Sequence, residues 1–83
     1  MDDLLNRIEV LLCTRFGVPK EEFRVDAALA DLDLDSLALV EFGLVAEKEF
    51  GVRVREEEVS PDDTVEDLVK LISGKISGKG VAA

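Results

Sequence analysis

Histidine, tryptophan and tyrosine are absent from this chain of 83 residues, and cysteine occurs only once. Without histidine, the chain has no Ser-His or Cys-His dyad for nucleophilic catalysis and no imidazole ligand for a metal ion. Its single cysteine, Cys13, has no partner for an internal disulfide, and the first residues lack the cationic and then apolar pattern of a secretory leader. We therefore expect a protein of the reducing cytoplasm, and not a self-sufficient hydrolase.

Basic residues are also scarce, because 10 Lys and Arg face 19 Asp and Glu, which gives a net charge of -9. Such a charge repels nucleic acid and anionic membranes, and it attracts basic protein surfaces. No apolar run approaches the roughly 18 residues that a membrane span requires. We expect a monomer whose partners are proteins with basic docking patches, with no nucleic-acid partner and no membrane partner.

Three stretches have apolar residues at the spacing of one helical face, namely residues 2–16, 36–50 and 64–72. Gly17 ends the first of these stretches and Gly51 ends the second. A short helical piece is expected within residues 52–59. The sequence thus predicts an all-α fold, a small four-helix bundle with three main helices, one short helix and a long loop between helices one and two.

The last helix has a clear start in the sequence. Thr64 can cap it, and Asp67 occupies the capping-box position that is more often Glu or Gln. We expect this helix to end at Ile72, before a glycine. Residues 74–83 mix Gly, Ser and Lys with few apolar anchors and are expected to form a flexible C-terminal tail, so that residues 1–73 make up the domain.

The predicted loop, residues 17–35, has no sustained period, but apolar residues recur through it. They are Val18, Phe23, Val25, Leu29 and Leu32, and we expect them to anchor the loop on the core. Ordered loops of this length are uncommon and often functional. In the helix that follows, Leu37, Val40 and Leu44 form an apolar stripe beside a second one, and together the two cover more surface than a small core can hide.

The stretch DLDLDSLALVEF, residues 31–42, places Ser36 at the start of the second helix, after alternating aspartates. A serine there is ordinarily an N-cap, because its hydroxyl satisfies one of the free backbone N–H groups. The same position also projects a hydroxyl into solvent at the positive end of the helix dipole, which favours a phosphodiester anion. Ser36 is therefore a candidate point of attachment for a phosphate group.

The residues around Ser36 resemble the signature of the acyl carrier protein family. The matching residues are Leu32-Asp33-Leu34-Asp35-Ser36-Leu37, then Val40-Glu41, then Glu47-Lys48-Glu49-Phe50-Gly51. Helix one, the long loop and the Thr-Val start of the last helix match as well, so that the resemblance runs from about residue 4 to residue 72. It implies a carrier with no enzymatic activity of its own, which holds acyl intermediates as thioesters on a covalent 4′-phosphopantetheine arm.

The resemblance assigns roles to individual positions. Ser36 matches the serine that a phosphopantetheinyl transferase modifies with coenzyme A, and Asp35 matches the aspartate that helps to place the magnesium ion of that coenzyme A. The face that partner enzymes recognise matches Leu37, Val40, Glu41, Leu44 and Glu47. The implied partners are the transferase and acyl-loading, condensing and acyl-processing enzymes.

The sequence departs from the family pattern at three positions. Asp33 stands where a glycine is usual, Ala38 stands where an acidic residue is common, and Lys48 interrupts the acidic row. These departures suggest specialised partners. Gly43, inside the second helix, costs about 1 kcal/mol relative to alanine and has no explanation in the sequence.

Three alternatives remain open. The first is a site for divalent cations, because the spacing of an EF-hand loop is present at Asp31, Asp33 and Asp35. That loop requires Gly at its sixth position and Glu at its twelfth, where this chain has Ser36 and Phe42. The alternative is therefore at most a helical interaction domain that binds divalent cations loosely. A peptidyl or aminoacyl carrier is a second alternative, although its motif more often reads Gly-Gly-x-Ser or Gly-His-Ser. The third is a plain helical interaction domain, which explains the acidity and the apolar face but leaves the long loop and Ser36 as coincidences. For an acyl carrier, the sequence does not select among fatty-acid, polyketide and other natural-product biosynthesis.

Overall fold

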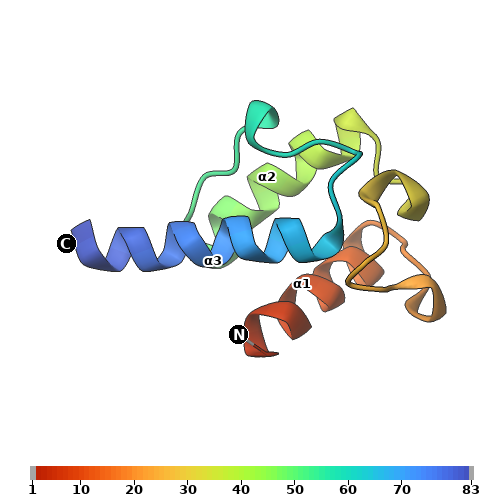
Figure 1. Cartoon of the computed structure of the whole chain (residues 1–83), viewed down its shortest axis with the longest axis horizontal. Coiled ribbons are helices and arrows are strands. Elements are labelled where there is room, and N and C mark those ends of the chain that lie inside the picture. Colours follow the sequence, from red (N-terminus) through yellow and green to blue (C-terminus); the bar gives the residue numbers. More distant parts are fainter. Residues whose placement is uncertain (1, 83) are drawn as a thin grey trace.

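The computed structural model describes residues 2–82, with side chains described for residues 3–77. Three helices, α1 (Asp2–Arg15), α2 (Ser36–Phe50) and α3 (Val65–Ala82), alternate with three 3-10 turns, η1 (Lys20–Glu22), η2 (Leu29–Leu32) and η3 (Glu56–Glu58). Figure 1 shows α2 and α1 on either side of the long helix α3, with η3 above it. The all-α bundle with one short helix before the last main helix is confirmed, and the loop contains two further short turns.

The core is aliphatic and is contributed by all three helices. Ile8 and Leu12 of α1 and Phe42 of α2 are 0% exposed, and the Phe16 ring packs at a tilt on Phe42 with 5.9 Å between the ring centroids. From α3, Val65, Leu68, Val69 and Ile72 face the same interior. Burial of these side chains, at about 25 cal/mol per Å² of apolar surface, holds the bundle together.

The long loop is anchored largely as predicted. Val18, Leu29 and Leu32 are buried, and Phe23 is partly buried against the core. The expectation that Val25 anchors the loop is wrong, because its side chain is 42% exposed. Its carbonyl accepts a hydrogen bond from the Glu66 N–H instead, at 2.9 Å. Periodicity alone does not separate an apolar anchor from a residue that is held through its backbone.

Backbone hydrogen bonds tie this loop to the segment before α3. Ala28 and Thr64 form an isolated antiparallel bridge, the Leu29 N–H donates to the Asp63 carbonyl at 2.8 Å, and the Val65 N–H donates to the Ala27 carbonyl at 3.1 Å. These bonds satisfy backbone groups that the loop would otherwise bury unpaired. They fix the loop immediately before the N-terminus of α2.

The capping box at the start of α3 is confirmed. The Thr64 hydroxyl accepts from the Asp67 N–H at 3.2 Å, and the Asp67 carboxylate accepts from the Thr64 N–H at 3.1 Å. The predicted end of this helix at Ile72 is wrong, because the helix continues through Gly74 to Ala82. A glycine weakens a helix by about 1 kcal/mol without terminating it, and Figure 1 shows the last turns of α3 extending beyond α1 and α2. The flexibility of residues 74–83 and the domain boundary stay predictions.

Within residues 2–82, no helix is both long and apolar enough to cross a membrane.

Candidate functional site

The N-terminus of α2 is organised by Asp35 rather than by Ser36. Asp35 is the N-cap, and its Oδ1 accepts a hydrogen bond from the Ala38 N–H at 2.9 Å. The interpretation of Ser36 as the cap is therefore corrected by one position, because a carboxylate satisfies the N-terminal N–H groups as well as a hydroxyl does. Ser36 is the exposed first residue of the helix, and no hydrogen bond engages its hydroxyl among the described residues.

A hollow of about 290 Å³ lies beside Ser36. Ser36 and Leu39 of α2 form one side of it, and the other side consists of Glu56, Glu57, Val59, Ser60 and Pro61. A free hydroxyl at a helix N-terminus, next to a hollow, fits a covalently attached phosphodiester, because the unpaired N–H groups and the helix dipole stabilise its negative charge. The residues present thus fit a phosphopantetheine group.

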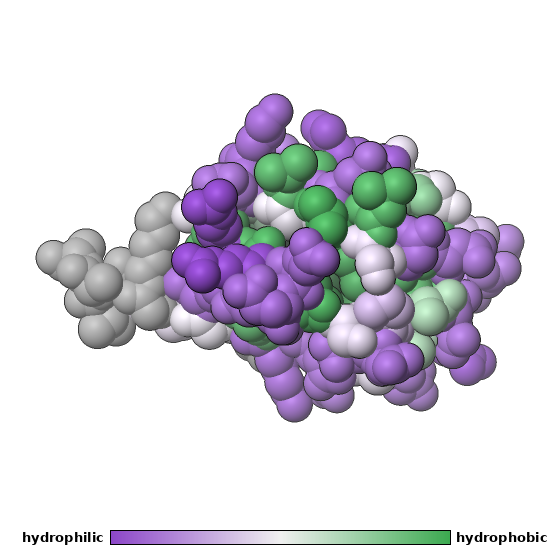
Figure 2. Space-filling model, turned by 90° about the horizontal axis from the view of Figure 1, so that it is seen from above, coloured by the Kyte–Doolittle hydropathy of each residue, from purple (hydrophilic) through white to green (hydrophobic). Residues whose placement is uncertain are grey.

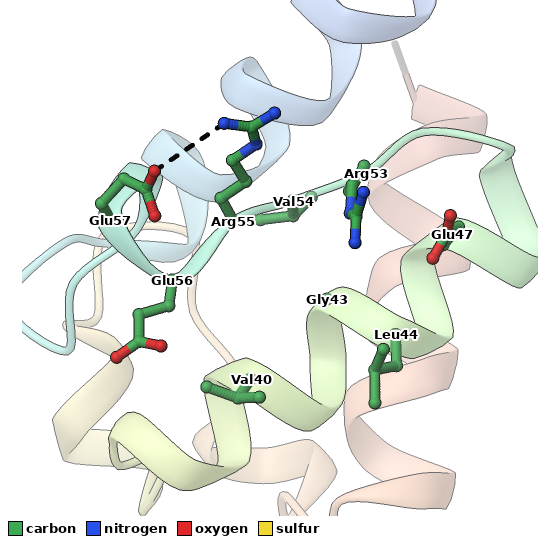
Figure 3. Close-up of a pocket in the computed structure, with 9 residues that line it drawn as sticks. All are labelled: Val40, Gly43, Leu44, Glu47, Arg53, Val54, Arg55, Glu56 and Glu57. Atoms are coloured by element: carbon green, nitrogen blue, oxygen red, sulfur yellow. Dashed lines mark ion pairs between the residues drawn. The ribbon is translucent and has the colours of Figure 1, made fainter.

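A larger groove of about 450 Å³ runs between α2 and the segment that leads into η3. Val40, Gly43, Leu44 and Glu47 line it from α2, and Arg53, Val54, Arg55, Glu56 and Glu57 line it from the opposite side. Figure 3 shows Arg53 extending toward α2, on the side where Leu44 and Glu47 lie. Glu56 and Glu57 border both the groove and the hollow beside Ser36, so the two spaces adjoin.

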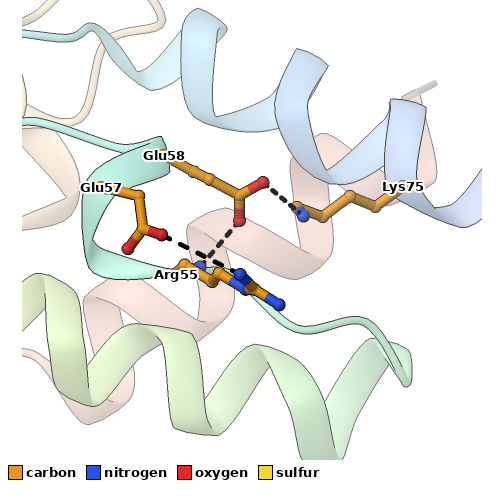
Figure 4. Close-up of polar contacts among 4 residues, drawn as sticks. All are labelled: Arg55, Glu57, Glu58 and Lys75. Atoms are coloured by element: carbon orange, nitrogen blue, oxygen red, sulfur yellow. Dashed lines mark hydrogen bonds and ion pairs between the residues drawn. The ribbon is translucent and has the colours of Figure 1, made fainter.

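Glu58 fastens η3 to α3. Its Oε1 accepts from the Arg55 N–H at 2.9 Å, and its Oε2 pairs with Lys75 Nζ at 2.8 Å (Figure 4). The hydrogen bond from Lys75, and then the one from the Arg55 backbone, lower the pKa of the Glu58 carboxyl. A looser ion pair of 4.0 Å joins Arg55 to Glu57. Lys75 therefore holds in place the turn that forms one wall of the hollow and of the groove.

The close approach of two backbones explains Gly43. A Cβ atom at this position would lie 2.6 Å from the carbonyl oxygen of Val54. Since such a distance is shorter than any ordinary contact, only glycine lets the segment before η3 lie against α2. Gly43 thereby sets the width of the groove.

The backbone at Asp33 explains another departure from the family pattern. Asp33 ends η2 in the left-handed conformation, with φ 64°. Glycine adopts this conformation freely, and aspartate is one of the few other residues that tolerate it. The position therefore requires a particular backbone shape, which the aspartate retains.

The residues that the sequence assigns to the partner face all lie on the exposed surface of α2. The side chains of Leu37, Val40 and Leu44 are 70%, 38% and 61% exposed, and Glu41 and Glu47 are exposed beside them. Figure 2, a view onto the η3 side of the molecule, shows apolar side chains surrounded by hydrophilic ones. The structure brings Val40, Leu44 and Glu47 together in the groove, whereas Leu37 and Glu41 lie outside its lining.

The structure gives the alternating aspartates no shared metal-binding role and the single cysteine no reactive role. Within the described part of the chain, no group of three or more carboxylate or thiol side chains is placed to hold a metal ion, so Asp31, Asp33 and Asp35 do not form a site together. Burial, and then the nearby charge of Glu9, raises the pKa of the Cys13 thiol. A raised pKa opposes formation of the reactive thiolate.

Sequence reasoning missed the residues of the wall opposite α2. Arg53 and Arg55 line the groove, and Ser60 lines the hollow beside Ser36. The available signal was the alternation of residues 52–55, in which the two valines are buried and the two arginines are exposed. Such alternation indicates an extended segment with one buried side, but it does not reveal which helix the segment faces.

Comparisons with known proteins agree with this geometry. The family model described as a phosphopantetheine attachment site matches residues 6–72. An acyl carrier protein of Petrotoga mobilis is 36% identical over 77 residues, covering 92% of this chain and 91% of its own, and one of Thermosynechococcus vestitus is 32% identical, covering 90% and 94%.

A non-reducing polyketide synthase, pkdA, of Emericella nidulans is 32% identical over 74 residues, which cover 89% of this chain and 3% of that protein. None of the solved structures matches the chain. The chain belongs to the acyl carrier protein family, and it is therefore a carrier for covalently attached 4′-phosphopantetheine that interacts with carrier-processing enzymes and is not itself an enzyme.

Proposed function

We propose that Ser36 is the residue that carries 4′-phosphopantetheine, and that the chain tethers acyl intermediates as thioesters in fatty-acid, polyketide or related natural-product biosynthesis. The observation that supports this most strongly is the exposed, unengaged hydroxyl of Ser36 at the first position of α2, inside the matched residues 6–72. The arm supplies a terminal thiol, and the protein supplies the attachment point and the surface that partner enzymes recognise.

Asp35 has two tasks in this proposal. Its Oδ1 caps α2 through Ala38, which places the Ser36 hydroxyl at the helix end. Its second oxygen is a hard ligand next to the attachment point, and a magnesium ion that accompanies coenzyme A prefers such oxygens. In the attachment step, Ser36 Oγ bonds to the pantetheine phosphorus, 3′,5′-ADP leaves, and the hydroxyl proton passes to a base of the transferase.

Intact-mass spectrometry tests the proposal with the full chain, coenzyme A and a promiscuous phosphopantetheinyl transferase. We expect the mass to increase by one phosphopantetheine, and Ser36→Ala to abolish the increase. Ser60→Ala is the matched control, since Ser60 lines the same hollow and should leave modification intact. Because Asp35 provides the cap, Ser36→Ala should stay folded by circular dichroism. Modification that persists in folded Ser36→Ala would refute the assignment.

We also propose a monomer in the cytoplasm whose partners are the transferase and acyl-loading, condensing and acyl-processing enzymes with basic docking patches. The net charge of -9 supports the monomer and the basic docking patches, because it disfavours self-association and attracts cationic surfaces. Light scattering coupled to size-exclusion chromatography measures the oligomeric state, and a dimer at micromolar concentration would contradict that part of the proposal.

A further inference from the structure

The groove beside the attachment site has an unusual lining for a carbon chain. Val40, Leu44 and Val54 offer apolar contact, but Arg53 and Arg55 bring two guanidinium groups and Glu47 brings a carboxylate to the same space. The core side of α2 is buried against the other helices and is closed to solvent, since Phe42 and Ala46 are 0% exposed. A chain tethered beside α2 therefore meets a surface that is part apolar and part ionic.

The groove is within reach of Ser36 along the helix. Val40 is four residues from Ser36 and Leu44 is eight, which corresponds to about 6 Å and about 12 Å along the axis of α2. The hollow beside Ser36 adjoins the groove at Glu56 and Glu57. Tethering raises the effective concentration of an attached chain at such a neighbouring surface, so that weak contacts suffice to hold it.

From this lining, and on the basis of the function proposed above, we infer that the groove selects neutral acyl chains that bear oxygen, and that Arg53 donates hydrogen bonds to a keto or hydroxyl oxygen of the cargo. Arg53 is exposed and has no ion-pair partner among the described residues. Arg55, in contrast, is paired with Glu57 at 4.0 Å. Arg53 is therefore the arginine of this lining that has no ion pair among the described residues.

The charges of the groove distinguish the classes of cargo. A saturated chain gains only the apolar contacts of the groove. It also covers the N–H donors of Arg53, and these donors then lose their water without gaining a new acceptor, which costs free energy. Three glutamates and two arginines line the groove, which gives the lining a net charge of -1. This net charge repels a chain that ends in a carboxylate. A neutral carbonyl or hydroxyl oxygen accepts from the guanidinium without that repulsion.

Nuclear magnetic resonance of loaded protein tests the inference. The chain is loaded with hydrolytically stable octanoyl-pantetheine and with its β,δ-diketo analogue, and the Arg53 side-chain Nε–H signal and the Val40 and Leu44 amide signals are followed. We expect all of these signals to move more with the diketo arm. Arg53→Gln should reduce the docked population of that arm by about threefold to tenfold, as expected for weakening of one solvent-exposed hydrogen bond of ordinary strength.

Arg24→Gln is the matched control, because Arg24 is an exposed arginine that lines a different hollow, with Glu21 and Asp26. It should leave the response to the diketo arm unchanged. Equal or larger shifts with the octanoyl arm, or an undiminished diketo response in Arg53→Gln, would overturn the inference. Failure of the proposed function is distinct, since it appears earlier, as absence of the added mass at Ser36.

Discussion

At the scale of single residues, the backbone at Asp33 controls how the loop enters α2. Asp33 has φ 64°, a region that costs an L-residue about 1–2 kcal/mol and costs glycine almost nothing. We expect Asp33→Gly to be more stable than Asp33→Ala by about 1 kcal/mol. Urea denaturation of both variants measures this difference, and equal midpoints would show that the loop relaxes away from this conformation.

Gly43 is the second residue whose backbone surroundings decide its identity. A Cβ atom would lie 2.6 Å from the Val54 carbonyl oxygen, so Gly43→Ala should force the two segments apart and destabilise the fold by about 1 kcal/mol or more. Gly74→Ala is the matched control, since its Cβ would meet nothing within 4 Å and alanine should stabilise the helix by up to about 1 kcal/mol. Thermal unfolding compares the two, and a Gly43→Ala variant as stable as Gly74→Ala would contradict the expected clash.

At the scale of the elements, the start of α3 couples stability to pH. Hydrogen bonds from the Thr64 backbone and then its side chain lower the pKa of Asp67 below its ordinary 3.8. A lowered pKa means that the stabilisation is complete above the ordinary value and disappears as the pH falls through the folded one. Asp67→Ala should therefore lower the melting temperature at pH 7 and have a decreasing effect toward pH 2.

Melting curves of wild type and Asp67→Ala across this pH range provide the measurement. Asp62→Ala, at an exposed aspartate of the preceding turn, is the control for the loss of one negative charge. A stability difference between wild type and Asp67→Ala that stays constant as the pH falls would assign the effect to packing and not to the ionised cap.

We expect partner enzymes to bind the exposed surface of α2 through charged residues at its edge and apolar residues at its centre. Glu41→Lys and Glu47→Lys should slow association with the transferase, more at low salt than at high salt, because edge charges act mainly on the rate of encounter. Leu37→Ala and Val40→Ala, which truncate exposed apolar side chains, should instead speed dissociation at every salt concentration.

Transferase kinetics over an ionic-strength series measures both effects, with circular dichroism to show that each variant is folded. Glu21→Lys, an exposed glutamate of η1, is the control for reversal of charge outside α2. If all four α2 variants behave as wild type does, the docking surface lies elsewhere on the molecule.

At the scale of the whole molecule, like charges oppose compaction. Residues 26–58 contain ten acidic side chains and three basic ones, a local net charge of -7. We expect added salt or millimolar magnesium to stabilise the fold by about 1 kcal/mol, which corresponds to about 4–8 °C in the melting temperature of a domain of this size. Differential scanning calorimetry measures the shift. A melting temperature indifferent to both would show that the fold already offsets the repulsion.

The sequence by itself determined the features that depend on near neighbours in the chain. Helical spacing and capping chemistry act within one or two turns, so α2 at Ser36–Phe50 and the Thr64–Asp67 capping box could be predicted. The sequence could not decide which residue caps α2, because Asp35 and Ser36 are both suitable N-caps. Only the three-dimensional backbone selects Asp35. The sequence also did not predict that α3 continues through Gly74. A glycine weakens a helix locally, but it does not by itself determine where the helix ends.

Only the tertiary structure decided the features that join distant parts of the chain. The approach of Val54 to Gly43, the ion pair between Glu58 and Lys75, and the position of Arg53 across from α2 each link different elements. No local period encodes such distances, because they result from how the whole core packs once the helices have formed. The proposed attachment residue, Ser36, could therefore be named from the sequence, whereas the groove beside it exists only in the folded chain.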